Sequence, residues 1–113
     1  MRPDVVITRG DVPEMPLEVI LTDSRGNPMD LSGHTQIRFH MRPVRGGSVI
    51  TGNASAVNFP GGDGRVRYVW QAANTQTVGD YWGEFEVIWG LTGKVVSFPT
   101  WPKLLVRVVP EVG

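Results

Sequence analysis

The stretch GDYWGEFEVIW, residues 79–89, decides the fold of this chain. Apolar and polar side chains alternate along it, and in a β-strand successive side chains point to opposite faces of the sheet. The stretch therefore predicts a strand with one face toward a core and the other toward the outside. On the inward face we expect Tyr81, Phe85, Val87 and Trp89, with Gly83 between them, and on the outward face Trp82, Glu84, Glu86 and Ile88.

A tyrosine follows a Gly-Asp turn at the start of this strand, after the segment 73–80. This arrangement is typical of the corner before strand F in immunoglobulin-like domains, where a tyrosine hydroxyl caps the upstream backbone. We therefore expect the Tyr81 hydroxyl to bond to the backbone that precedes the strand.

The rest of the chain is predicted to form short strands separated by glycine- and proline-rich turns, without a convincing helical period. Besides the stretch above, the expected strands are Val5 to Thr8, Leu17 to Leu21, Gln36 to Arg42, Ser48 to Thr51, Asn53 to Asn58, Val66 to Trp70, Val95 to Phe98 and Lys103 to Val109. The predicted fold class is all-β: an immunoglobulin-like antiparallel β-sandwich of about 7–9 strands. It forms a single domain over residues 1–113. A partly closed barrel is the structural alternative.

Composition limits the chemistry that this chain can perform. The sequence has no cysteine, which excludes disulfides, thiolate catalysis and cysteine-based metal sites. Its 11 basic and 11 acidic residues cancel, so no global field favours nucleic acid or a membrane. The first apolar run is too short for a signal peptide, and no run approaches the roughly 20 residues of a membrane helix. We expect a protein made in the cytoplasm, with neither nucleic acid nor a membrane as its partner.

Candidate catalytic and metal-binding residues are few. His34 and His40 are expected on the same outer face of one strand, about 20 Å apart at the usual rise per residue, too far to share a metal. The loop from Asp23 to Asp30 lacks the acidic ligand that a calcium-binding loop carries at its far end. Asp and Asn side chains that bond their own backbone in turns explain this loop better. We expect no catalytic residue, no cofactor and no metal.

The outward aromatic residues indicate a surface for a partner. An outward tryptophan is better explained by burial against another chain than by folding. Arg38 and Arg42 are expected near Glu84 and Glu86 on the outer face, where opposite charges help to specify the strand register. Stacking of a tryptophan on a sugar is the alternative use. The residues expected at a partner interface are Trp82, Ile88, Trp101, Arg38 and Arg42.

Two blocks of the sequence resemble small tailed-phage virion proteins and are similar to the N-terminal domain of phage baseplate upper proteins. The first runs from Gly10-Asp11 through PLEVILTDSRGNPMDLSG at 16–33 to IRFHMR at 37–42. The second joins GRVRYVW at 64–70 to GDYWGEFEV at 79–87 and to Phe98-Pro99. The resemblance spans most of the chain and consists of strand and turn patterns rather than a catalytic signature.

The resemblance implies an immunoglobulin-like β-sandwich that attaches to other virion proteins and carries no enzymatic residues. Baseplate upper proteins continue into long fibre or anchoring regions, whereas this chain stops at Gly113, so we expect a free-standing component. The predicted function is that of a non-enzymatic structural component of a tailed bacteriophage virion, as a capsid decoration, neck or tail/baseplate accessory protein. It would be made in the host cytoplasm and be present in many symmetric copies. The alternative is a carbohydrate or cell-surface binding module.

Overall fold

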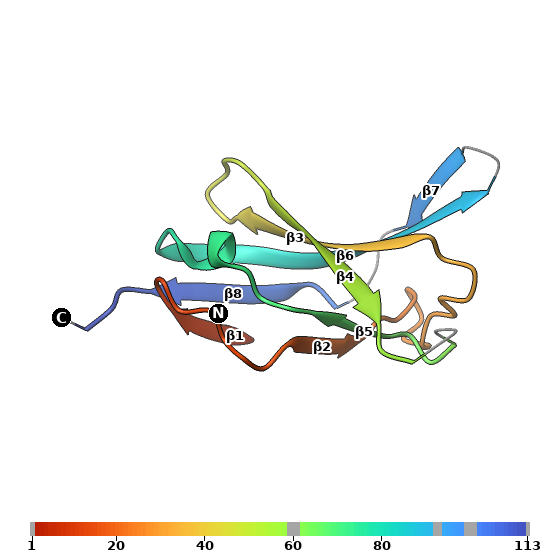
Figure 1. Ribbon diagram of the computed structural model, residues 1–113, viewed down its shortest axis with the longest axis horizontal. Helices are drawn as coiled ribbons and strands as arrows, with labels where there is room; N and C mark the ends of the chain where they lie inside the picture. Colours follow the sequence, from red (N-terminus) through yellow and green to blue (C-terminus); the bar gives the residue numbers. More distant parts are fainter. Residues whose placement is uncertain (1, 59–61, 92–93, 99–101, 113) are drawn as a thin grey trace.

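A computed structural model describes residues 2–58, 62–91, 94–98 and 102–112, and Figure 1 shows a sandwich-like arrangement of strands. A short 3-10 helix, η1 (Ala72–Thr75), lies between the strands β5 (Arg65–Tyr68) and β6 (Gly79–Leu91). The predicted all-β, sandwich-like fold class is confirmed. In the described part of the chain, no helix has the length and apolar character needed to cross a membrane. The strands are β1 (Val5–Thr8), β2 (Leu17–Ile20), β3 (Gln36–Pro43), β4 (Ile50–Ala56), β5 (Arg65–Tyr68), β6 (Gly79–Leu91), β7 (Lys94–Phe98) and β8 (Leu104–Val109).

Hydrogen bonds link the strands in the order β1-β8-β6-β3-β4-β5-β2, and β7 pairs with the C-terminal part of β6. Strand β4 takes part in both layers, because its residues 50–54 pair with β3 whereas Ser55 and Ala56 pair with β5. In Figure 1 this strand runs across from β3 toward β5, so the sheet folds over its own core.

One strand pair differs from the antiparallel arrangement that the sequence predicts. β1 runs parallel to β8, with Val5 opposite Val106 and Thr8 opposite Val109. A tight hairpin can join only antiparallel neighbours, and parallel strands need a long connection. Nearly the whole chain separates β1 from β8, so the two strands can pair in a parallel as well as in an antiparallel direction.

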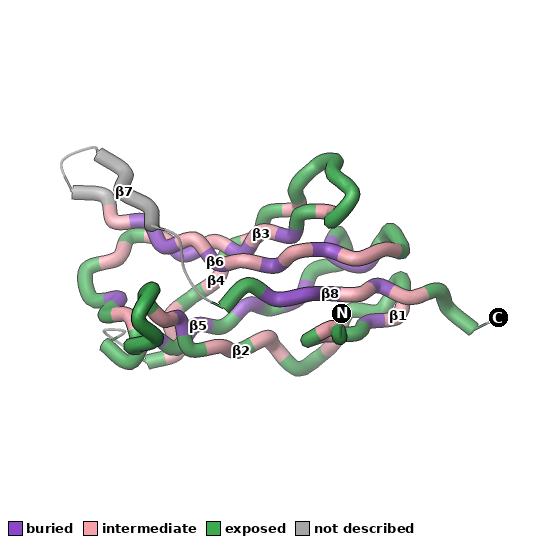
Figure 2. Tube along the Cα trace, turned by 180° about the vertical axis from the view of Figure 1, so that it is seen from behind, coloured by how far each residue is buried: buried purple, intermediate pink, exposed green. Residues whose placement is uncertain are grey.

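The core is built from the inward faces of the central strands. Phe39 lies in the middle of an aromatic cluster, with ring centroids 4.6 Å from Tyr68, 4.9 Å from Phe85 and 5.9 Å from Trp70. Trp89, which was expected on the same face, is half-buried and packs against the cluster. Figure 2 shows burial running along β3, β6 and β8, with exposed loops at both ends. The predicted alternation is confirmed by the buried side chains of Ile37, Phe39 and Met41 on β3 and of Tyr81, Phe85 and Val87 on β6.

Glycines let two strands approach the aromatic rings closely. A Cβ atom at Gly83 of β6 would lie 2.9 Å from Cζ of Phe39, and one at Gly52 of β4 would lie 2.6 Å from the hydroxyl oxygen of Tyr68. The prediction of two weak strands on either side of Gly52 is wrong, because these residues form the continuous strand β4. Gly52 does not break the strand: it leaves room for the Tyr68 ring.

Polar groups hold the corner that precedes β6. The Tyr81 hydroxyl donates a hydrogen bond of 2.6 Å to the carbonyl oxygen of Thr77, which confirms the predicted bond to the upstream backbone. Asn74 of η1 is buried, and its Oδ1 accepts hydrogen bonds from the Tyr68 hydroxyl at 2.6 Å and from the Gln71 backbone N–H at 2.8 Å. Buried polar groups are costly without partners, so these bonds fix η1 against β5.

Candidate partner interface

The outer face is the side of β3 and β6 that points away from the core. The antiparallel register places Arg38 opposite Glu86 and Arg42 opposite Trp82. Strand β8 extends this face, because Leu105 lies opposite Trp82 on the other side of β6. The register between strands therefore decides which outward side chains meet. The outer face consists of Gln36, Arg38, His40 and Arg42 on β3 and Trp82, Glu84, Glu86 and Ile88 on β6.

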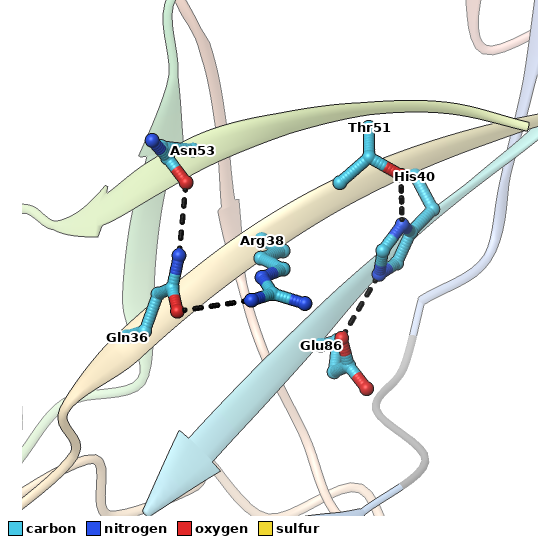
Figure 3. Close-up of polar contacts among 6 residues, drawn as sticks. All are labelled: Gln36, Arg38, His40, Thr51, Asn53 and Glu86. Carbon is cyan, nitrogen blue, oxygen red and sulfur yellow. Dashed lines mark hydrogen bonds and ion pairs between the residues drawn. The ribbon is translucent and has the colours of Figure 1, made fainter.

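His40 connects three strands on this face (Figure 3). Its Nε2 lies 3.0 Å from Oε1 of Glu86 on β6, and its Nδ1 lies 2.8 Å from Oγ1 of Thr51 on β4. A carboxylate can only accept hydrogen bonds, so Nε2 carries the hydrogen, and in the neutral ring Nδ1 accepts from the Thr51 hydroxyl. Both imidazole nitrogens are therefore occupied by neighbouring strands.

Gln36 makes a second cross-strand link beside His40 (Figure 3). Its Nε2 donates to Oδ1 of Asn53 at 3.0 Å, and its Oε1 accepts from the Arg38 guanidinium at 3.3 Å. Cross-strand pairs of this kind contribute about 0.2–1 kcal/mol each. The bond to Gln36 orients the guanidinium of Arg38 along its own strand.

A depression of about 450 Å³ lies further along the outer face and is lined by Arg42, Trp82, Glu84 and Lys103. Trp82 is half-buried and Arg42 is exposed. The Lys103 ammonium lies 3.8 Å from a carboxylate oxygen of Glu84, so these two charges compensate each other across the depression. The site combines an indole ring with a guanidinium group, and these two groups are enriched in protein interfaces.

A second depression, of about 630 Å³, lies where β3 ends and β6 begins. Its wall includes Val44 and Val78, whose side chains are 46% and 41% exposed. Its lining begins at Pro43 and Tyr81, the residues next to Arg42 and Trp82 in the chain, and the two depressions share no lining residue. Exposed apolar side chains beside a depression are typical of docking surfaces.

Asp80 and Arg107 form an ion pair between β6 and β8 at the edge of these depressions. Nε of Arg107 lies 2.8 Å from Oδ1 of Asp80, and Nη2 of Arg107 lies 3.1 Å from Oδ2 of Asp80. The hydrogen bonds from Arg107 hold the pKa of Asp80 below its ordinary value of 3.8. Such a two-point contact is directional, so it fixes the relative position of the two strands on this face.

The residues predicted for a partner interface are only partly brought together. Trp82 and Arg42 line the same depression, whereas Arg38 lies further along β3 and bonds to Gln36. The expected proximity of arginines and glutamates is confirmed, because Arg38 lies opposite Glu86 in the register and Arg42, which lies opposite Trp82, lines the same depression as Glu84. Trp101 lies outside the described residues.

Ile88 requires a correction. It was expected as an exposed contact, but only 5% of it is exposed. At this position β6 is flanked on one side by Gln36 of β3 and on the other by Ser97 of β7, and the Thr35 hydroxyl bonds to the Ile88 carbonyl oxygen. Ile88 therefore leaves almost no side-chain surface for a partner.

Lys103, Val44 and Val78 line the depressions but were not among the predicted site residues. Lys103 is far from Glu84 in sequence, and the two meet only because β8 lies beside β6. The exposed valines lie in turns, where strand alternation says nothing about burial. A signal for them was present in the sequence as apolar residues next to the ends of two predicted strands.

The histidines and the aspartate loop serve local structure. Nδ1 of His34 lies 2.7 Å from the carbonyl oxygen of Leu31, and His34 precedes β3 instead of lying in the same strand as His40. Backbone N–H groups of Asn27 and Arg25 hold the pKa of Asp23 below its usual value. This confirms the predicted Asx-type turn. Among the described residues, no group of three His, Cys, Asp or Glu side chains is placed to hold a metal ion.

Comparisons with known proteins show where a similar fold occurs. No protein-family model matches the sequence, and no curated protein matches it. Among solved structures, the fold is similar to the N-terminal domain of phage TP901-1 ORF48, with a TM-score of 0.68 and 19% sequence identity. The match covers 92% of this chain and 82% of that chain. At this level of identity the similarity shows the fold alone, and the chain has a fold that is also found in a phage protein domain.

Proposed function

We propose that this chain is a non-enzymatic structural component of a tailed bacteriophage virion and acts by docking onto neighbouring virion proteins. The observation that carries the proposal is the similarity to a phage protein domain over 92% of the chain. The resemblance of its strand and turn segments to the N-terminal domain of baseplate upper proteins supports it. The chain would be made in the host cytoplasm and join the virion as a capsid decoration, neck, or tail or baseplate accessory protein.

The sandwich is proposed to be of the immunoglobulin-like class. In that class one layer contains strands B, E and D and the other contains C, F and G. The pairing here supports the same arrangement, with β2-β5-β4 in one layer and β3-β6-β8 in the other. The bond from the Tyr81 hydroxyl to the backbone before β6 also supports it. All described strands belong to one hydrogen-bonded sheet, which supports a single domain over residues 1–113.

The non-enzymatic part of the proposal is supported by the way the outer face uses its titratable groups. Both nitrogens of His40 are engaged by Glu86 and Thr51. A general base needs a free nitrogen within hydrogen-bond reach of its substrate. Asp80 is likewise held by Arg107. These groups support cohesion between strands rather than proton transfer.

Docking through the outer face suits a protein that is present in many copies. The near-zero net charge gives no general attraction to nucleic acid or lipid, which supports proteins as the partners. If virion symmetry repeats the chain, a modest contact per copy suffices, because the effective concentration of each site is high once a neighbour is engaged. The surface proposed for this contact is centred on the depression lined by Trp82 and Arg42, with the second depression at the end of the same strand pair.

Mass spectrometry of purified phage particles tests the proposal. We expect peptides of this chain in particles that have been banded by density, in a constant ratio to a major structural protein and resistant to a high-salt wash. Particles from a deletion mutant should lack it and show a defect in assembly, stability or adsorption. Recovery of the chain only from the soluble fraction of the lysate, with none in banded particles, would contradict the proposal.

A carbohydrate or cell-surface binding module is the second candidate, and the Trp82 depression is the observation that favours it. An indole ring flanked by Arg42 and Glu84 could stack on a sugar and bond its hydroxyl groups. Binding of the wild-type chain, but not of Trp82→Ala, on a glycan array would support this function. An array without signal, for a chain that is present in particles, would remove it.

A further inference from the structure

We propose that the Trp82 depression receives an acidic, partly apolar segment of a partner protein, with a carboxylate beside Arg42 and an apolar side chain against the Trp82 indole. This inference rests on the proposed docking function and adds to it the chemistry of the partner. The depression is formed by two strands and the segment before a third, because Arg42 comes from β3, Trp82 and Glu84 from β6, and Lys103 directly precedes β8.

The charge of Arg42 is available to a partner from outside the chain. Within the described residues, the guanidinium of Arg42 takes part in neither a hydrogen bond nor an ion pair, and it is exposed. Neighbouring charges on the same sheet are paired locally, as in Asp80 with Arg107. A carboxylate is the group that matches the guanidinium fork in two-point hydrogen bonding.

The surroundings favour an acidic segment over a basic or neutral one. Two basic side chains, Arg42 and Lys103, line the depression with one acidic side chain, Glu84, although the chain as a whole is neutral. Such a local excess steers a segment of opposite charge and sets its orientation.

The apolar surface at the end of the same strand pair favours a protein over a sugar. Exposed Val44 and Val78 line the second depression, where β3 ends and β6 begins. Sugars present hydroxyl groups that such side chains cannot bond, whereas an apolar side chain next to a carboxylate fits both surfaces. Tryptophan and arginine also dominate the energetically important positions of protein interfaces.

A titration followed by NMR tests the partner chemistry directly on the full-length chain. The probes are a short capped peptide of alternating leucine and glutamate and the same peptide with glutamine in place of glutamate. We expect the Trp82 indole N–H resonance, assigned with Trp82→Phe, to shift saturably with the glutamate peptide. The glutamine peptide and a raised salt concentration should weaken the effect, since exposed ion pairs are screened.

The variant Arg42→Gln and its control Arg25→Gln make the test specific. Both arginines are exposed, but Arg25 lies in the turn after β2, away from the outer face. Arg42→Gln should weaken binding of the glutamate peptide about two- to fivefold, as expected for one exposed ion pair, and Arg25→Gln should leave it unchanged. Equal shifts with both peptides, equal effects of both variants, or a Trp82 shift produced only by an oligosaccharide would overturn the inference.

Rebinding to particles separates the inference from the proposed function. Particles from the deletion mutant are mixed with the wild-type chain, with Arg42→Glu or with Arg25→Glu, and the bound fraction is measured after sedimentation. Selective loss of binding with Arg42→Glu supports the inference. Full binding of all three chains overturns it and leaves the virion function standing. Absence of the chain from native particles contradicts the virion function, and the peptide titration then still decides the chemistry of the depression.

Discussion

Replacing Gly83 by alanine tests whether the aromatic core is as tightly packed as the structure indicates. The new Cβ atom would lie 2.9 Å from Cζ and 3.1 Å from Cε1 of Phe39, closer than real Cβ contacts. The tip of a flexible side chain could move aside, but the Phe39 ring is fully buried and held by Tyr68, Trp70 and Phe85. The strain must therefore spread through the cluster.

The expected cost follows from two opposing effects. Overpacking a well-filled core destabilises a protein by about 1–3 kcal/mol. Alanine in a strand interior regains about 0.5–1 kcal/mol relative to glycine, because the unfolded chain loses conformational freedom. We expect Gly83→Ala to lower the free energy of unfolding by about 1–2 kcal/mol, which corresponds to a fall in Tm of roughly 4–8 °C per kcal/mol for a domain of this size.

Urea unfolding followed by tryptophan fluorescence measures this change. The matched control is Gly62→Ala, since a Cβ atom at Gly62 meets nothing within 4 Å, and this variant should be as stable as the wild type or slightly more. Phe39→Leu should relieve the clash, so the cost of Gly83→Ala should be smaller in that background. A Gly83→Ala variant as stable as the control would refute the reasoning, because it would show that the Phe39 ring can move freely.

Three further predictions concern polar groups. Asn74→Ala should lower the free energy of unfolding in urea by about 2–3 kcal/mol, because the buried Tyr68 hydroxyl loses its acceptor; wild-type stability would contradict this. Tyr81→Phe should cost about 1 kcal/mol in the same assay, because one hydrogen bond to the upstream backbone is lost, and a neutral result would show that the corner does not depend on it. The bond to Arg107 lowers the pKa of Asp80 below 3.8 in the folded state. Its stabilisation should therefore be fully present well above that pH and be lost as the pH falls through the lowered value. Thermal melts from pH 7 to pH 2 should show a smaller fall of Tm with falling pH for Asp80→Asn than for the wild type. An equal fall in both proteins would argue against the ion pair.

The sequence was sufficient to predict which side chains enter the core. Alternation in residues 79–89 placed Tyr81, Phe85 and Val87 inside, and all three are buried. It also predicted the bond from the Tyr81 hydroxyl to the preceding backbone. These predictions succeed because they depend on the period of two residues in a strand and on the chemistry of one turn, and both are local properties.

The candidate site could not be predicted to the same extent. Alternation correctly placed Trp82 and Arg42 on the outer face, but it also placed Ile88 there as an exposed contact. Ile88 is only 5% exposed. The contact between Lys103 and Glu84 depends on the pairing of β8 with β6. The contacts made on the outer face thus depend on which strands are neighbours, and no local pattern encodes that.

The sequence by itself determined most of the strand segments and the inward faces of the central strands, because steric preferences and hydrophobic periodicity act within a few residues. The tertiary structure alone decided the pairing register, the parallel contact of β1 with β8, the passage of β4 between the two layers and the meeting of Arg42 with Trp82. These features arise from the packing of segments that are distant in the chain, where the shape of the shared core selects one arrangement from many that local preferences allow.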